Sequence, residues 1–221
     1  FMYLANNAAG RIDVFDENFA AATLTGSFID PNLPAGLAPF NVQNIGGELY
    51  VTYAIPGPDA DEVDLGSGVV DVFDTNGNFI RRVASGGALA SPWGLALAPS
   101  DFGTFSNALL VGNFNDEHGI INAFDPISGS FLGTLTDVND NAIAIPDLWG
   151  LSFGNGGNGG PTNALFFAAG IGDELHGLFG RLDVAVAAVP EPDIALLVLS
   201  ALTGVLMCRG PKRRPRSPRR L

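Results

Sequence analysis

The chain has 221 residues, 47% of them hydrophobic, with 29 glycines, 15 prolines and a formal net charge of −12. This composition argues against a disordered chain or a helical bundle and favours a turn-rich β protein with one sizeable core. The charge is unevenly distributed along the chain. Residues 1–190 contain four arginines and 21 carboxylates, a net charge of −17, whereas seven basic residues follow Met207. A domain this acidic repels nucleic acid, so we expect no nucleic-acid partner.

Four short patterns recur along residues 1–186. The first is centred on an aromatic residue, Phe40, Trp93 or Trp149, at intervals of 53 and 56 residues. The second is an apolar strand, written MYLANN, LYVTYA, LLVGNF and LFFAAG; the third is GRIDVFD, GVVDVFD, GIINAFD and, more loosely, GLFGRLD. A weaker fourth pattern reads ATLTGSF, FIRRVAS and FLGTLTD. Four strand-like patterns in a repeat of about 50–60 residues are typical of β-propeller blades.

In chain order, residues 1–30 are predicted to hold strands two to four of one blade, 36–86 and 91–137 two complete blades, and 147–186 strands one to three of another. The predicted fold class is therefore all-β: a partial β-propeller with about three and a half blades of a ring expected to have six. The turn Asp74-Thr75-Asn76-Gly77 is expected to connect two strands as a tight hairpin.

After the repeats, the sequence predicts three further segments. Residues 187–193 form a linker with a Pro-Glu-Pro motif, and residues 194–208 are 15 apolar residues followed by a basic stretch at 209–221. Apolar residues followed by dense positive charge indicate one C-terminal transmembrane helix with a cytoplasmic tail. The segment is shorter than the roughly 20 residues of a typical span, so a buried core helix is the alternative.

The loops between the second and third strands of each blade are expected to surround the central channel, where propellers bind ligands. Two of these loops share an acid-acid-His composition: they contain Asp116, Glu117 and His118, and Asp173, Glu174 and His176. Carboxylates and imidazoles are ligands for Ca²⁺ or a transition metal, which makes these six residues a candidate metal site. The alternative is that they are solvated surface residues, duplicated together with the blade.

Three other motifs give weaker evidence for a functional site. Residues 137–141 begin like a calcium loop, but Ala142 and Leu148 replace the glycine and glutamate of an EF-hand, leaving at most a single weak Ca²⁺ site. The glycine-rich segment 154–160 is interpreted as a hairpin connection rather than a phosphate loop. The aromatic residues of the first pattern are expected to pack between blades, with carbohydrate stacking as the alternative. We predict no catalytic and no cofactor-binding residue. No Ser-His-Asp or Cys-His arrangement can be proposed, because the sequence has no G-x-S-x-G motif and its one cysteine, Cys208, lies in the apolar tail.

The tail resembles the PEP-CTERM sorting signal of Gram-negative bacteria, and the wording NIGGELYVTYA and SPWGLALAP resembles a family of exported bacterial repeat proteins. The residues that carry the tail resemblance are Val189, Pro190, Glu191, Pro192, Arg209, Arg213 and Arg214. The resemblance implies recognition by an exosortase-type enzyme, anchoring in the inner membrane, and then delivery to the cell surface or an exopolysaccharide matrix. Because residues 1–30 show no secretory signal, we expect the chain to be an N-terminally truncated piece.

From these patterns we expect a non-catalytic module that binds exopolysaccharide or surface proteins, or that acts as a structural scaffold. The blades are more distantly similar to gluconolactonase-like six-bladed propellers. That similarity implies an alternative function, a metal-dependent hydrolase or lactonase that uses the acidic loops. Because fold does not determine function, the resemblance alone does not choose between these activities.

Overall fold

The computed structural model describes residues 1–57, 60, 62–116, 118–172 and 174–185, and Phe1–Val184 form one compact unit. Within this part of the chain there are 13 β-strands and a single 3-10 turn, Gly103–Phe105. The strands are β1 Met2–Asn6, β2 Arg11–Phe15, β3 Ala38–Ile45, β4 Glu48–Ala54, β5 Val69–Phe73, β6 Phe79–Ser85, β7 Pro92–Leu97, β8 Leu109–Asn113, β9 Ile121–Phe124, β10 Phe131–Thr134, β11 Leu148–Phe153, β12 Leu165–Ala169 and β13 Leu178–Leu182. The prediction of an all-β protein is confirmed.

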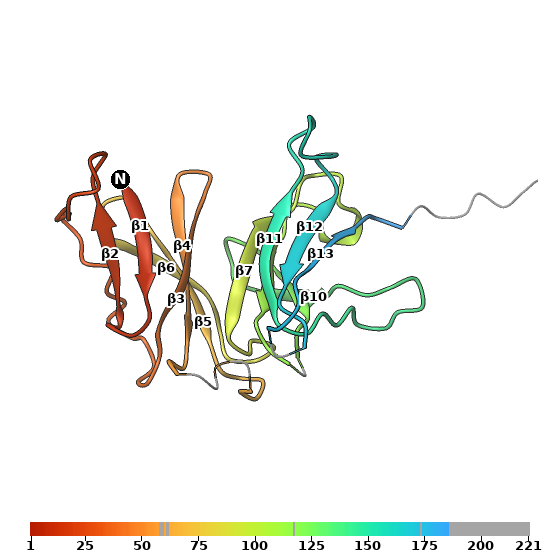
Figure 1. The fold of residues 1–221 in the computed structure, drawn as a ribbon, viewed down its shortest axis with the longest axis horizontal. Coiled ribbons are helices and arrows are strands. Elements are labelled where there is room, and N and C mark those ends of the chain that lie inside the picture. Colours follow the sequence, from red (N-terminus) through yellow and green to blue (C-terminus); the bar gives the residue numbers. More distant parts are fainter. Residues whose placement is uncertain (58–59, 61, 117, 173, 186–221) are drawn as a thin grey trace, which may run out of the picture. The chain divides into compact units, whose positions relative to one another are not determined.

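The strands form four antiparallel sheets in which each strand pairs with its neighbour in the sequence (Figure 1). Their orders are β1-β2, β3-β4-β5-β6, β7-β8-β9-β10 and β11-β12-β13. Each sequence pattern has a constant place: the first forms β3, β7 and β11, the second β1, β4, β8 and β12, and the third β2, β5, β9 and β13. One sheet is thus one repeat of the sequence.

Apolar clusters lie between successive sheets and constitute the core. Side chains alternate along a strand, so each strand of an inner sheet contributes to two clusters. In β8, Leu109 and Val111 pack on the preceding sheet, while Leu110 packs on the following one, and all three are 0% exposed. This alternation explains why the second pattern is apolar at consecutive positions.

The predicted hairpin at residues 74–77 is present between β5 and β6. The Asp74 carboxylate oxygen Oδ1 accepts hydrogen bonds from the backbone N–H groups of Asn76 (2.8 Å) and Asn78 (2.9 Å). Gly77 has φ +80°, a conformation that an L side chain would strain. The local sequence therefore determined this turn.

The predicted strand at residues 22–28 is wrong. The structure has only an isolated bridge between Phe15 and Ala21 at this edge of the first sheet. The segment crosses instead to the second sheet, where the Phe28 N–H donates to the Gly77 carbonyl (2.9 Å) and the Phe28 ring joins the apolar cluster between the first two sheets. The burial of the Phe28 ring and the backbone hydrogen bond of Phe28 stabilise this path of the chain, in place of the strand pairing that the repeat predicted.

The described residues form four separate sheets and no closed ring. The predicted linker at 187–193, the apolar segment at 194–208 and the basic tail at 209–221 lie outside the described residues. In the part of the chain that the structure describes, no helix is long and apolar enough to span a bilayer. The fold class is accordingly corrected to all-β, with neither a closed propeller nor a transmembrane helix among its observed elements.

Candidate functional site

The first strand of each of the last three sheets begins with a β-bulge at its aromatic residue. Phe40 is skipped in the pairing of β3 with β4, Trp93 in the pairing of β7 with β8, and Trp149 with Gly150 in the pairing of β11 with β12. A bulge leaves a residue outside the ladder and redirects its side chain. The three bulges therefore turn the three aromatic side chains out of the regular alternation.

These side chains meet in one cluster, which we call the inner aromatic cluster: Phe40, Trp93, Phe114 and Trp149. The ring centroids of Phe40 and Trp93 are 4.6 Å apart, and those of Trp93 and Trp149 are 5.5 Å apart. Phe114 contacts all three rings at 5.9 to 6.1 Å. Neighbouring sheets are also joined here by a hydrogen bond from the Asn41 side-chain amide to the Trp93 carbonyl (2.9 Å).

Exposure differs along the inner aromatic cluster. Phe114 is buried, Phe40 and Trp93 are half-buried, and Trp149 is 40% exposed. None of the four rings belongs to the apolar clusters between the sheets. The predicted packing between sheets is observed for Phe40 and Trp93, but it does not account for the open face of Trp149.

An open pocket of about 300 Å³ lies beside Trp149. Its lining residues are Trp149, Ala168, Ala169, Gly170, Glu174, His176 and Gly177. The loop after β12 carries the two polar side chains, and it is held by backbone bonds from Glu174 N–H to Gly170 O (2.8 Å) and from His176 N–H to Ile171 O (3.1 Å). The pocket thus combines one aromatic surface with a carboxylate and an imidazole, both on exposed residues.

The predicted metal site is not assembled by the described residues. Asp116 is exposed and His118 half-buried on the loop after β8, whereas Glu174 and His176 line the pocket beside Trp149. Glu117 and Asp173 lie outside the described residues. Within the described ranges no three Asp, Glu, His or Cys side chains come together as a metal site would require. Metal binding by the full set of six residues stays a prediction.

The calcium-loop motif at residues 137–141 forms a turn in which the Asp137 carboxylate Oδ1 accepts N–H groups of Asn139 (2.8 Å) and Asn141 (3.0 Å). The hydrogen bonds of these backbone amides hold the pKa of Asp137 below its usual value. This carboxylate therefore has a local structural role, as in the Asp74 turn. The sorting residues Val189, Pro190, Glu191, Pro192, Arg209, Arg213 and Arg214 lie outside the described residues.

Sequence reasoning found three members of the inner aromatic cluster and missed Phe114. Phe114 occupies the sixth position of the second pattern, where the other repeats have Asn7, Ala54 and Gly170. No repeat signal marks it, and only the packing of the sheets shows that it supports both tryptophans.

A buried carboxylate with a strongly raised pKa, Asp71, lies away from this cluster, between the first two sheets. Asp71 on β5 is 0% exposed, and burial raises its pKa to about 7 although Arg82 Nε donates to Oδ1 at 3.1 Å. Arg82 also pairs with the buried Asp30 carboxylate. One arginine, Arg82, is shared by the two buried acids Asp30 and Asp71. This ion cluster is a structural feature rather than a site.

No family model matches the chain. Its similar proteins include three uncharacterised proteins of Acanthamoeba polyphaga mimivirus. The first is 33% identical over 188 residues, covering 82% of this chain and 45% of the relative. The second is 34% identical over 191 residues, with 82% and 48% covered, and the third is 35% identical over 159 residues, with 68% and 29% covered. The chain spans less than half the length of these curated relatives.

These relatives correct the predicted origin of the chain. The resemblance to an exported bacterial family with a PEP-CTERM signal is wrong, because the similar proteins are viral. The Gram-negative localisation, the inner-membrane anchor and the exosortase partner depended on that resemblance and are withdrawn with it. The prediction failed because residues 189–221 resemble the bacterial tail only in a three-residue motif and in composition. The similarity to the viral protein extends over 188 residues.

Proposed function

We propose that the chain is a non-catalytic binding module and that the inner aromatic cluster, with the pocket beside Trp149, holds its ligand. The observation that carries this proposal is the indole of Trp149, which is 40% exposed and packs against Trp93 and Phe114. Because these two rings hold the indole in place, it offers a rigid apolar surface, and little side-chain entropy is lost when a ligand binds.

The ligand that fits this site best is a neutral carbohydrate chain. A sugar ring has a flat apolar face and a rim of hydroxyl groups, which suit the indole of Trp149 and the polar side chains of Glu174 and His176. The charge of −17 over residues 1–190 disfavours anionic polymers. These properties support a glycan over a nucleic acid or an acidic peptide.

We also propose that the four sheets are blades of a β-propeller-like arrangement, with the first strand of each complete sheet nearest the centre. Contacts run in succession from β1 to β3, from β3 to β7 and from β7 to β11. In such an arrangement the inner aromatic cluster lies where propellers bind ligands, which supports its assignment as the site.

The binding proposal is tested by titrating the full chain with neutral oligosaccharides of β-glucan, chitin and xylan while tryptophan fluorescence is recorded. We expect saturable binding of at least one glycan, weakened at least tenfold by Trp149→Ala, a loss of about 1.4 kcal/mol. Val138→Ala, at an 81% exposed position in another loop, serves as the matched control. Absence of binding to every glycan, or equal binding by Trp149→Ala, would contradict the proposal.

A further inference from the structure

A buried group of charged side chains holds the segment that connects the first two sheets. We call this segment, residues 22–37, the crossover segment. Its Asp30 is 6% exposed, and the Asp30 carboxylate pairs with Arg82 of β6. Arg82 Nη2 also donates to the Asn32 carbonyl at 3.1 Å. One arginine side chain therefore binds the crossover segment at two places.

The same arginine pairs with a second buried carboxylate. Arg82 Nε donates to Asp71 Oδ1 at 3.1 Å, and Asp71 is 0% exposed. Alternate residues of a strand point to the same side, so Asp71 faces the first sheet and the crossover segment together with Val69 and Phe73. Among the described residues, the second oxygen of this carboxylate, Oδ2, is buried without a hydrogen-bond partner. Two buried acids thus depend on one arginine.

The net charge of this group depends on a single proton. Two carboxylates and one guanidinium carry a net charge of −1, and one added proton makes the group neutral. Burying an uncompensated charge is costly, particularly when one carboxylate oxygen has no hydrogen-bond partner. In agreement, burial raises the pKa of Asp71 to about 7, and the charge of Asp30 contributes, although Arg82 acts in the opposite direction.

We propose that Asp30, Asp71 and Arg82 form a proton-dependent clasp, which holds the crossover segment on the second sheet while the two acids share one proton and releases it when both are ionised. Release admits water to Asp71 and so relieves the buried charge. The groups that act on Asp71 come from three surrounding elements: Asp30 from the crossover segment, Arg82 from β6 and Tyr53 from β4. Burial and the charges of the two acids raise the pKa of Tyr53, so its phenol stays neutral and does not compensate them.

The direction of the pH effect follows from comparing the closed and released states. In the released segment Asp71 is solvated and has its ordinary pKa of 3.8, whereas in the closed segment its pKa is about 7. The closed state binds the proton more tightly, so closure is most favourable below pH 3.8 and weakens as the pH rises through 7. Within this window the equilibrium between the two states shifts by up to about tenfold per pH unit.

The test is amide hydrogen exchange of the full chain at pH 5 and pH 7, with each rate expressed relative to that of the unfolded peptide at the same pH. The reporters are the N–H groups of Gly26 and Phe28, which donate to the carbonyls of Asn76 (2.8 Å) and Gly77 (2.9 Å). We expect their protection to fall at least tenfold from pH 5 to pH 7. The amides of β8, in the third sheet, should remain more strongly protected than the reporters at both pH values.

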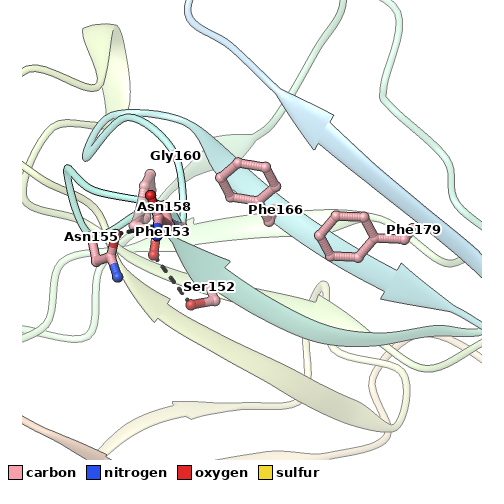
Figure 2. Close-up of a pocket in the computed structure, with 8 residues that line it drawn as sticks. Ser152, Phe153, Asn155, Asn158, Gly160, Phe166 and Phe179 are labelled. Atoms are coloured by element: carbon pink, nitrogen blue, oxygen red, sulfur yellow. Dashed lines mark hydrogen bonds between the residues drawn. The ribbon is translucent and has the colours of Figure 1, made fainter.

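Two variants remove one acid each. Asp71→Asn cannot ionise, so the protection of the reporters should no longer depend on pH. Asp30→Asn leaves one acid for Arg82 and should reduce the dependence. An amide oxygen can replace the Asp30 Oδ1 that accepts the Asn32 N–H (2.9 Å), because Asn155 Oδ1 accepts the Gly157 N–H at 2.9 Å in the loop that Figure 2 shows.

Asp13→Asn, at the position of β2 equivalent to Asp71, is the matched control and should retain the wild-type pH dependence. Strong protection of the β8 amides in every variant verifies that the sheets are intact. Equal protection of the reporters at pH 5 and pH 7 in the wild type would overturn the inference, as would a dependence that survives Asp71→Asn. Reporters protected as strongly as β8 would also overturn it, because the crossover segment would then open only when the whole molecule unfolds.

Discussion

The two middle sheets and the two end sheets are built from the same repeat but differ in their surroundings. Sheets β3–β6 and β7–β10 have an apolar cluster on each side, whereas β1–β2 and β11–β13 each contact one cluster. Equivalent positions are therefore buried in the middle and exposed at the ends. The comparison therefore separates two contributions to stability: the contacts that a residue makes within its own sheet, and the contacts that it makes with a neighbouring sheet packed against it.

The largest expected difference concerns the third pattern. Ile121→Ala removes a 0% exposed side chain between two sheets and should lower the free energy of unfolding by about 2–5 kcal/mol. Phe179→Ala, at the equivalent but 73% exposed position, should change it by less than about 0.5 kcal/mol. Urea unfolding at low protein concentration measures both. Equal losses would show that the two faces are covered alike.

A second difference concerns one acidic position of the third pattern. Asp13 in the first sheet has a pKa lowered chiefly by its hydrogen bond from the Arg11 side chain, whereas burial raises the pKa of Asp71 in the second sheet from 3.8 to about 7. The folded protein binds the Asp71 proton more tightly than the unfolded chain. This stabilisation is complete below pH 3.8 and is lost as the pH rises through 7.

We therefore expect the free energy of unfolding to fall by roughly 2–3 kcal/mol between pH 5 and pH 7, at about 1.4 kcal/mol per pH unit. Asp71→Asn retains an oxygen for Arg82 and should remove most of this slope, while Asp13→Asn should leave it unchanged. Denaturant unfolding at several pH values provides the measurement. If the free energy of unfolding of the wild type did not change between pH 5 and pH 7, the pKa of Asp71 would not be raised in the folded protein, and the prediction would be wrong.

The smallest expected difference concerns the glycine after each tryptophan. A Cβ at Gly94 would lie 2.7 Å from the carbonyl oxygen of Trp149 and 2.8 Å from Leu151 Cγ, whereas a Cβ at Gly150 would meet nothing within 4 Å. Gly94→Ala should cost about 1–3 kcal/mol, because the third and fourth sheets must separate. Gly150→Ala should stay within about 0.5 kcal/mol. Thermal unfolding compares the two, and a neutral Gly94→Ala would contradict the close contact.

The sequence alone determined the local structure of this protein. Repeated patterns predicted the all-β class and nearly all of the strands, and the Asp74 turn was recognised from its own residues. These predictions succeeded because strand periodicity and turn chemistry depend on neighbours in the chain. The candidate site was predicted in part: the recurring aromatic residues were found, but Phe114 and the open face of Trp149 were not.

Only the tertiary structure decided which of these equivalent residues are covered. Trp93 and Trp149 occupy the same position of the same pattern, yet one supports a neighbouring ring and the other borders an open pocket. Likewise Asp13 is exposed in part and Asp71 is fully buried. Alternation along a strand sets the side to which a side chain points, but its burial, pKa and access to ligand depend on which sheet, distant in sequence, lies against that side.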